Sequence, residues 1–190
     1  MPSKALTTWF DESLAAFDRM EEAHSRTGGT GRGRRYFIDH LNQSYTVLVA
    51  SHFQRFCRDL HSESIDVLAQ WAHGQSAELE LLMRDLARKR SLDGGNANPG
   101  TIGNDFNRFG LLFWNAIDQT HRGVTRHERL EVLNAWRNAI AHQDFKSVGG
   151  HRYVGLREVQ AWRGTCTGLA QAFDRLMRTH LRRIIGAWPW

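Results

Sequence analysis

Apolar side chains recur every three to four residues along almost the whole chain, which is the spacing of one face of an α-helix. No pair of segments alternates apolar and polar residues as neighbouring strands would. The pattern therefore predicts an all-α protein. The expected helices cover residues 8–25, 35–61, 65–74, 77–90, 104–117, 126–142 and 156–185.

Glycine, asparagine, proline and serine mark the expected connections between these helices. They are the basic, glycine-rich stretch TGGTGRGRR (27–35), a break at SES (62–64), the irregular Gly/Asn-rich loop SLDGGNANPGTIGN (91–104), and a loop over 146–155 with a short extended piece at HRYVG. Thr125 and Glu128 have the spacing of a capping box for the helix over 126–142. We expect a single-domain helical bundle over 1–190, with an N-terminal helix and basic loop in 1–34 and the core in 35–190.

The composition is that of a globular protein with an arginine-rich surface. The net charge is +5, the isoelectric point is about 9.8, and only three of the 25 Lys and Arg residues are Lys. Arginine binds phosphate through two parallel hydrogen bonds and stacks on bases, so this balance suits a nucleic-acid partner. A general preference of the source for arginine explains the composition equally well, and the charge does not decide between the two.

The sequence also leads to expectations about the location of the protein and about the state of its two cysteines. No run of about 18 apolar residues is present, so no membrane span is expected. The first residues lack the pattern of a signal peptide, which predicts a cytoplasmic protein. Cys57 and Cys166 both fall inside helical patterns and are expected to be buried, reduced thiols.

Several kinds of site are excluded by their missing motifs. The glycine-rich stretch at 27–35 has no preceding strand and no Gly-Lys-Ser/Thr ending, so it is not a phosphate-binding P-loop. The chain has no HExxH, no CxxC and no carboxylate pair with di-metal spacing, so neither a metal site nor another cofactor is expected. His121 and His127 flank a turn and are expected to be surface residues.

The segment NAWRNAIAHQDF (134–145) places two ionisable groups near the end of an apolar helix. The spacing alone is weak evidence, because Arg followed five residues later by His occurs five times. The pairs are Arg19/His24, Arg35/His40, Arg122/His127, Arg137/His142 and Arg175/His180. A helical wheel separates the fourth pair from the others. It predicts a core face of Val132, Leu133, Trp136, Ala139 and Ile140, and an opposite polar strip of Asn134, Asn138 and His142 bordered by Arg137. An ordinary solvated face with a cation at the helix C-terminus also explains this strip, and the residues alone do not decide between the two.

The segment RNAIAHQD, after the helix LEVLNAW, resembles the signature of the HEPN superfamily (higher eukaryotes and prokaryotes nucleotide-binding domains). Ribonucleases of this superfamily carry Arg, a polar residue that is often Asn, three further residues and then His. The order of a long early helix, a variable middle, a motif helix and a long closing helix is also similar. The resemblance covers 126–145 closely and 35–190 loosely.

This resemblance implies a function and a set of site residues. It implies a metal-independent endoribonuclease, acting as a toxin or antiviral defence effector, in which the 2′-hydroxyl of RNA attacks the neighbouring phosphate. Arg137 and His142 would be catalytic and Asn138 would assist. It also implies a homodimer with a composite site and a possible cognate antitoxin or defence partner. Around this motif we expect RNA contacts from Arg122, Arg126, Arg129 and Asn134. The alternative is a non-catalytic HEPN-like module that dimerises or binds a nucleotide or a partner protein.

Overall fold

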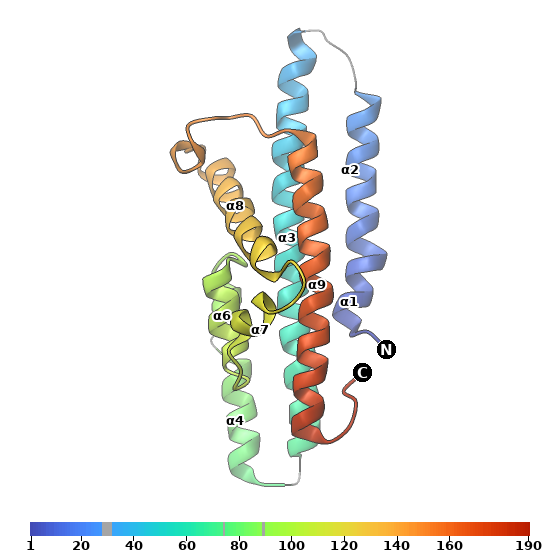
Figure 1. The fold of residues 1–190 in the computed structure, drawn as a ribbon, viewed down its shortest axis with the longest axis vertical. Helices are drawn as coiled ribbons and strands as arrows, with labels where there is room; N and C mark the ends of the chain where they lie inside the picture. The colour runs from blue at the N-terminus through green and yellow to red at the C-terminus, as the bar shows by residue number, and fades with distance from the viewer. Residues whose placement is uncertain (28–31, 74, 89) are drawn as a thin grey trace.

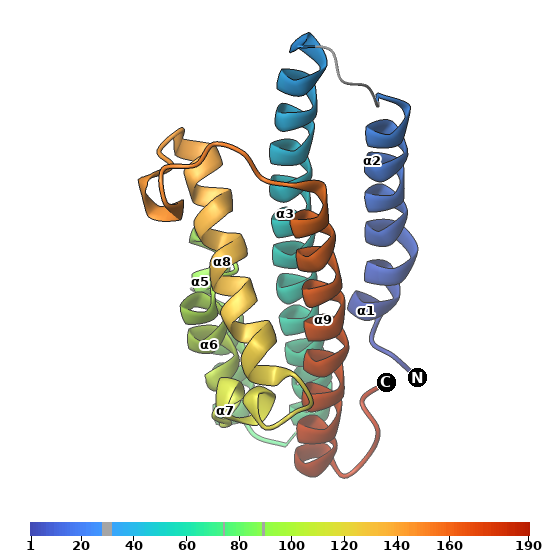
Figure 2. The ribbon, with the colours of Figure 1, turned by 45° about the horizontal axis from the view of Figure 1, so that its top comes forward.

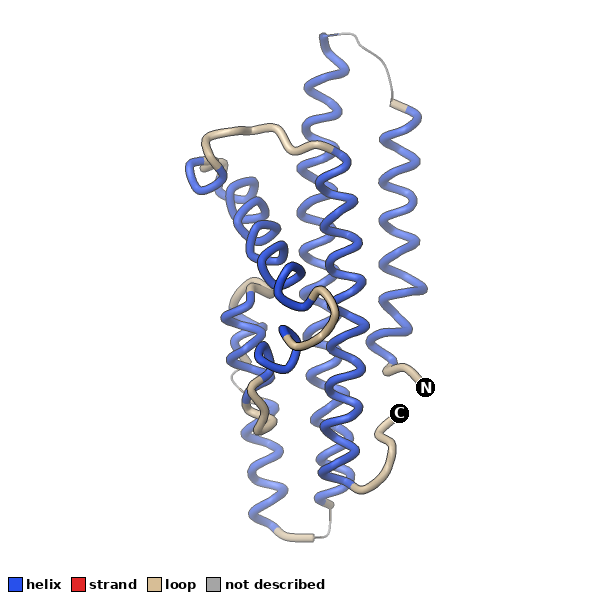
Figure 3. Tube along the Cα trace, in the orientation of Figure 1, coloured by secondary structure: helices blue, strands red, loops and turns tan. Residues whose placement is uncertain are grey.

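The computed structural model describes residues 1–27, 32–73, 75–88 and 90–190, and within these residues the chain is helical, with no strand (Figures 1 and 3). The all-α prediction is therefore confirmed. Residues 28–31 of the predicted glycine-rich loop lie outside the described residues. Within the described part of the chain, no helix is both long enough and apolar enough to cross a membrane.

Two long helices form the centre of the molecule. They are α3 (Arg32–Ala72) and α9 (Leu156–Ile185), which run side by side in the same direction (Figures 1 and 2). An N-terminal helical segment runs back along them in the opposite direction. It consists of α1 (Lys4–Thr8), the π-helical turn η1 (Trp9–Ser13) and α2 (Leu14–Arg26). Shorter helices cover the other side of the pair.

Aromatic side chains from η1, α2, α3, α9 and one of the shorter helices form much of the core. Trp9 lies edge-on to Phe17 and Phe53, with ring centroids 5.7 and 6.1 Å away. Phe173 of α9 packs against Phe53 and against Phe113 of a shorter helix. Since Trp9 and Phe17 are almost fully buried, the N-terminal segment belongs to the same core as residues 35–190. The predicted division at residue 35 does not separate a core from an appendage.

The predicted break at 62–64 is wrong, because α3 continues through it to Ala72. Ser64 is buried and donates to the carbonyl of Leu60 one turn earlier. Glu63 accepts hydrogen bonds from the backbone N–H groups of Lys4 and Ala5. These N–H groups have no partner within the first turn of α1. The Ser-Glu-Ser stretch therefore attaches the N-terminal segment to α3 instead of ending α3.

The second side of the molecule consists of α4 (Ala77–Ala87), α5 (Ser91–Gly94), α6 (Pro99–Asn107), α7 (Phe113–Asp118) and α8 (Gly123–His142). The predicted loop at 91–104 is thus largely helical. The buried carboxylate of Asp105 accepts from the N–H groups of Ser91 and Leu92, which stabilises the start of α5.

The single helix predicted over 104–117 is instead α6 and α7, separated by residues 108–112. Gly110 in this connection has a φ of 82°, a conformation that favours glycine. The side chain of Asn107 accepts from the N–H of Phe113 and so begins α7.

Helix α9 has the bounds that the apolar pattern predicts, but α8 begins earlier than expected, at Gly123. Thr125 therefore lies inside α8 and the predicted capping box does not form. The 143–155 connection contains a short 3₁₀ turn, η2 (Lys146–Val148). Its HRYVG stretch forms neither a helix nor a strand. The side chains of Asn42 and Gln43 bind the carbonyls of Val154 and Arg152 and hold this stretch against α3.

Candidate functional site at the C-terminal end of α8

The end of α8 that carries the motif leans away from the central helix pair (Figure 1). It closes with a Schellman arrangement. The N–H of Asp144 donates to the carbonyl of Ala139 at 3.1 Å, and the N–H of Gln143 donates to that of Ile140 at 3.3 Å. Gln143 takes the left-handed conformation that this ending requires, with φ 53°. Phe145 then turns back into the protein, where it is buried beside Trp136. The helix therefore stops directly after His142.

Arg137 and Asn138 are joined through the amide oxygen of Asn138. This oxygen accepts from Nη1 of Arg137 at 3.3 Å and from the side-chain nitrogen of Asn96 at 2.5 Å. Asn96 belongs to the connection between α5 and α6. With the oxygen engaged twice, the Asn138 side chain, which is exposed, directs its NH₂ donors elsewhere. The motif thus includes one residue, Asn96, that the sequence pattern did not indicate.

His142 occupies the last turn of α8 and is exposed. Its ring makes no hydrogen bond and no ion pair with any described residue. The ring is therefore accessible on both nitrogens for proton exchange with a bound molecule.

The wheel prediction for α8 is confirmed at some positions and wrong at two. Leu133 and Ala139 are buried, as predicted, but Val132 is 45% exposed. Asn134 was expected on the exposed polar strip and is instead 7% exposed. Its amide nitrogen donates to the carbonyls of Ala97 and Leu130 at 3.1 and 3.0 Å. Asn134 therefore joins α8 to the segment before α6 and is not available to contact RNA.

The three predicted RNA-binding arginines lie in different surroundings, toward the other end of α8. Arg122 is exposed and precedes the helix in a left-handed conformation, with φ 62°. Arg129 is exposed on α8. Arg126 lies across α9 and reaches the carbonyl of Gly168 at 3.4 Å. A rise of about 1.5 Å per residue puts Arg122 about 22 Å along the axis from Arg137. Arg122, Arg126 and Arg129 are thus not gathered with Arg137 in one protomer.

His127, predicted to be an ordinary surface residue, is a packed one. Its ring stacks on Trp114, with centroids 4.0 Å apart and planes 19° apart. Its Nδ1 lies 3.3 Å from the carboxylate of Asp118. No local sequence pattern indicates this contact, because Trp114 and Asp118 come from α7 and meet His127 only through the turn at Gly123.

The site at the end of α8 combines a fixed guanidinium, an amide with free donors and an accessible imidazole. This set can bind an anionic oxygen and move a proton. Among the described residues, no three His, Cys, Asp or Glu side chains are grouped to hold a metal ion. Comparisons with protein-family models, with curated protein sequences and with solved structures give no match to this chain.

Proposed function

We propose that this protein is a metal-independent endoribonuclease of the HEPN type. The observation that carries the proposal is the pairing of the Arg137–Asn138 hydrogen bond with the accessible, unpaired His142 on the same outward-leaning helix end. The resemblance of RNAIAHQD to the HEPN ribonuclease signature assigns chemistry to these three residues. The end of α8 supports that assignment by leaving His142 accessible on the surface.

In the proposed reaction, the ribose 2′-oxygen attacks the adjacent phosphorus and the bond from phosphorus to the 5′-oxygen breaks. His142 removes the proton of the 2′-hydroxyl or donates a proton to the leaving 5′-oxygen. Arg137 binds the non-bridging oxygens, where negative charge develops in the transition state. The free NH₂ of Asn138 donates to one of the same oxygens. The products are a 2′,3′-cyclic phosphate and a 5′-hydroxyl, and DNA is spared because it lacks the nucleophile.

A second copy of the chain completes the site in this proposal. Arg137 and His142 project about 140° apart on the helix, so one copy does not easily direct both at one phosphate. Two copies related by a twofold axis supply two histidines, one as base and one as acid. The exposed Val124 and Val132 of α8, at 53% and 45%, provide apolar surface for such a contact. The same surface favours the alternative function, a HEPN-like module that dimerises or binds a partner without cutting RNA.

The test is incubation of the purified protein with RNA, followed by mapping of the cut sites and mass spectrometry of the ends. We expect cyclic phosphate and 5′-hydroxyl ends, unchanged cleavage in EDTA, and loss of cleavage in Arg137→Ala. Arg88→Ala, an exposed arginine at the end of α4, is the matched control and should cut normally. Full activity of Arg137→Ala, or loss of activity in EDTA, contradicts the proposal. Intact dimers without any cleavage favour the binding module.

The proposed biological setting is that of a toxin or antiviral defence effector with a cognate inhibitor or partner. Expression in a bacterial host tests it, because a ribonuclease toxin slows growth and the Arg137→Ala variant does not.

A further inference from the structure

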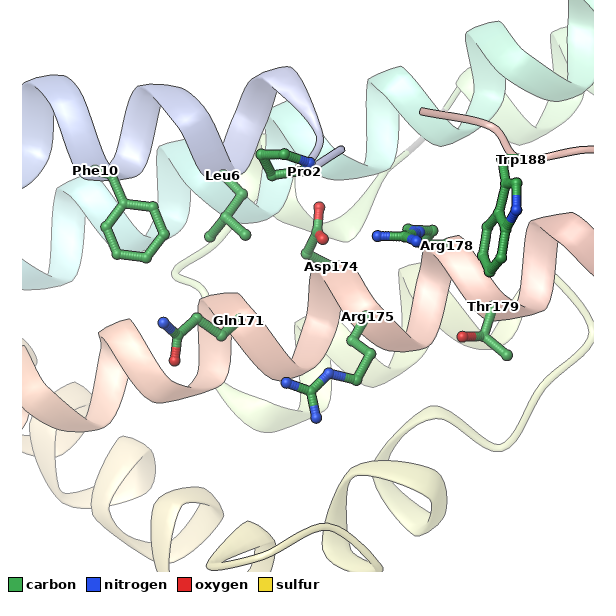
Figure 4. Close-up of a pocket in the computed structure, with 9 residues that line it drawn as sticks. All are labelled: Pro2, Leu6, Phe10, Gln171, Asp174, Arg175, Arg178, Thr179 and Trp188. Carbon is green, nitrogen blue, oxygen red and sulfur yellow. The ribbon is translucent and has the colours of Figure 1, made fainter.

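One face of α9 carries three neighbouring hollows, between the N-terminal helical segment on one side and the turn from α7 to α8 on the other. The first, of about 540 Å³, is lined by residues that include Phe10, Arg178 and Trp188 (Figure 4). The second, of about 400 Å³, includes His121 and Arg126. The third, of about 370 Å³, includes Arg163 and Gly164.

The three hollows adjoin one another along α9, because neighbouring hollows share lining residues. Gln171, Arg175 and Thr179 line both the first and the second. Arg126, Gly168 and Gln171 line both the second and the third. From Gly164 to Thr179 the helix rises about 22 Å. We call this surface the α9 groove.

The α9 groove has positive charge that the protein does not neutralise. Arg126, Arg175 and Arg178 line it, and none of them forms an ion pair with a described carboxylate. Arg163 at its far end differs, since it pairs with Asp18 at 2.7 Å and Glu21 at 2.9 Å. The one carboxylate in the wall, Asp174, is only 5% exposed and accepts from the N–H of Ser3. An anionic ligand therefore meets guanidinium groups whose charge no described carboxylate neutralises through an ion pair.

Two features hold these arginines along the groove. A side chain at Gly168 would place its Cβ 2.5 Å from the guanidinium of Arg126, so the glycine is what lets Arg126 lie flat on α9. At the other end, the guanidinium carbons of Arg178 and Arg182 lie 4.4 and 3.9 Å from the centroid of the Trp188 ring. The cation–π contact with Trp188 keeps the Arg178 side chain in the wall of the first hollow.

Exposed aromatic rings add a second kind of contact. Trp188 is 51% exposed and Phe10 is 38% exposed, and both border the first hollow (Figure 4). A basic groove with aromatic side chains is the arrangement by which proteins bind single-stranded nucleic acid, through phosphates and stacked bases. Double-stranded RNA is instead recognised by its shape over about 16 base pairs, far longer than this groove.

We infer that the α9 groove binds a single-stranded RNA segment, with its phosphates on Arg126, Arg175 and Arg178 and with separate bases against the Phe10 ring and the Trp188 ring, which lie at opposite ends of the first hollow (Figure 4). This binding site goes beyond the proposed cleavage and does not depend on it. Arg126 is separated from His142 by about 24 Å along α8. The groove and the motif are therefore distinct surfaces of one protomer.

The test measures fluorescence anisotropy with a labelled 2′-O-methyl oligonucleotide of mixed sequence and about 12 nucleotides, which covers a typical single-strand site. The methyl groups remove the nucleophile, so binding is measured without cleavage. We expect Arg175→Ala to weaken binding of the oligonucleotide roughly tenfold. The slope of the logarithm of affinity against the logarithm of salt concentration should become shallower by about one, because one phosphate contact is lost. Arg88→Ala removes the same charge outside the groove and should change binding less than twofold, by the same counting of phosphate contacts.

Gly168→Ala is the second variant, because it displaces Arg126 without removing its charge. Alanine is a better helix former than glycine, so the thermal midpoint should not fall, while the oligonucleotide should bind several-fold more weakly. Equal effects of Arg175→Ala and Arg88→Ala, or undiminished binding by Gly168→Ala, overturn the inference. So does a groove that binds duplex RNA or an acidic peptide in preference to the oligonucleotide.

The same measurement separates this inference from the proposed function. Cleavage by a wild-type protein that does not bind the oligonucleotide overturns the groove alone. Binding by a protein that never cuts RNA overturns the proposed ribonuclease alone.

Discussion

Arg122 and His127 stand at the start of α8, and Arg137 and His142 stand at its end, with the same five-residue separation. At the start, His127 is stacked on Trp114 and faces the carboxylate of Asp118. The turn before it is equally constrained, since a Cβ on Gly123 would lie 2.0 Å from the carbonyl oxygen of Ile117. At the end, His142 is exposed and has no described partner.

Spacing alone therefore does not define a site. The histidine at the start of α8 is occupied by packing and by a carboxylate of its own protomer, so its role is structural. The histidine at the end is left accessible on the same helix end as Arg137, whose guanidinium is hydrogen-bonded to Asn138.

The largest expected effect is on cleavage, and it separates the two histidines. His142→Ala should lower the rate of RNA cleavage by at least about 100-fold, the usual contribution of a general acid or base. His127→Ala should keep the rate within about twofold of wild type but lower the free energy of unfolding by about 1 kcal/mol, because the stacked, carboxylate-bound ring is lost. Single-turnover cleavage and urea denaturation measure the two quantities. If His127→Ala is inactive and His142→Ala is active, the catalytic histidine lies at the start of α8, and our assignment of His142 is wrong.

A third histidine, on α3, is more buried than either of these two. His61 is fully buried between Phe106 and Phe109, and this burial lowers its pKa to about 4. In the unfolded chain the group takes up its proton near pH 6.5. Between these pH values the unfolded state binds more protons than the folded state does. The free energy of unfolding is therefore unaffected by His61 protonation above about pH 6.5, and it decreases as the pH falls toward 4.

We therefore expect His61→Leu to lose less stability in acid than wild type does. The difference between the two proteins should grow to about 3 kcal/mol between pH 6.5 and pH 4. Denaturant unfolding at a series of pH values measures it. His142→Leu, which changes an exposed ring, is the control and should retain the wild-type pH dependence. If the free energy of unfolding changes with pH in the same way in wild type and in His61→Leu, then His61 does not contribute to the pH dependence of stability.

The sequence predicted what depends on local pattern and missed what depends on distant partners. Helix α9 follows its apolar repeat, and Arg137, Asn138 and His142 lie on the helix predicted for them. Helix α6 was missed although Asn98 and Pro99 are a recognisable helix start. Asn134 was misplaced for a different reason. A helical wheel contains no information about neighbouring segments. In the structure the carbonyl of Ala97 lies against this face of α8 and accepts from the side-chain amide of Asn134.

Asn96 was missed for the same reason, and it gives the smallest expected effect. Its side-chain amide donates to the amide oxygen of Asn138, which also accepts from the guanidinium of Arg137. Loss of one such hydrogen bond costs about 1 kcal/mol. Asn96→Ala should therefore lower the cleavage rate about fivefold, with little change in KM, because it affects the orientation of Asn138 more than the binding of RNA. Asn115→Ala, an exposed asparagine on α7, is the matched control and should cleave as wild type does. An Asn96→Ala protein with the full wild-type rate would mean that Arg137 alone orients Asn138, and that the α8 end needs no support from the segment before α6.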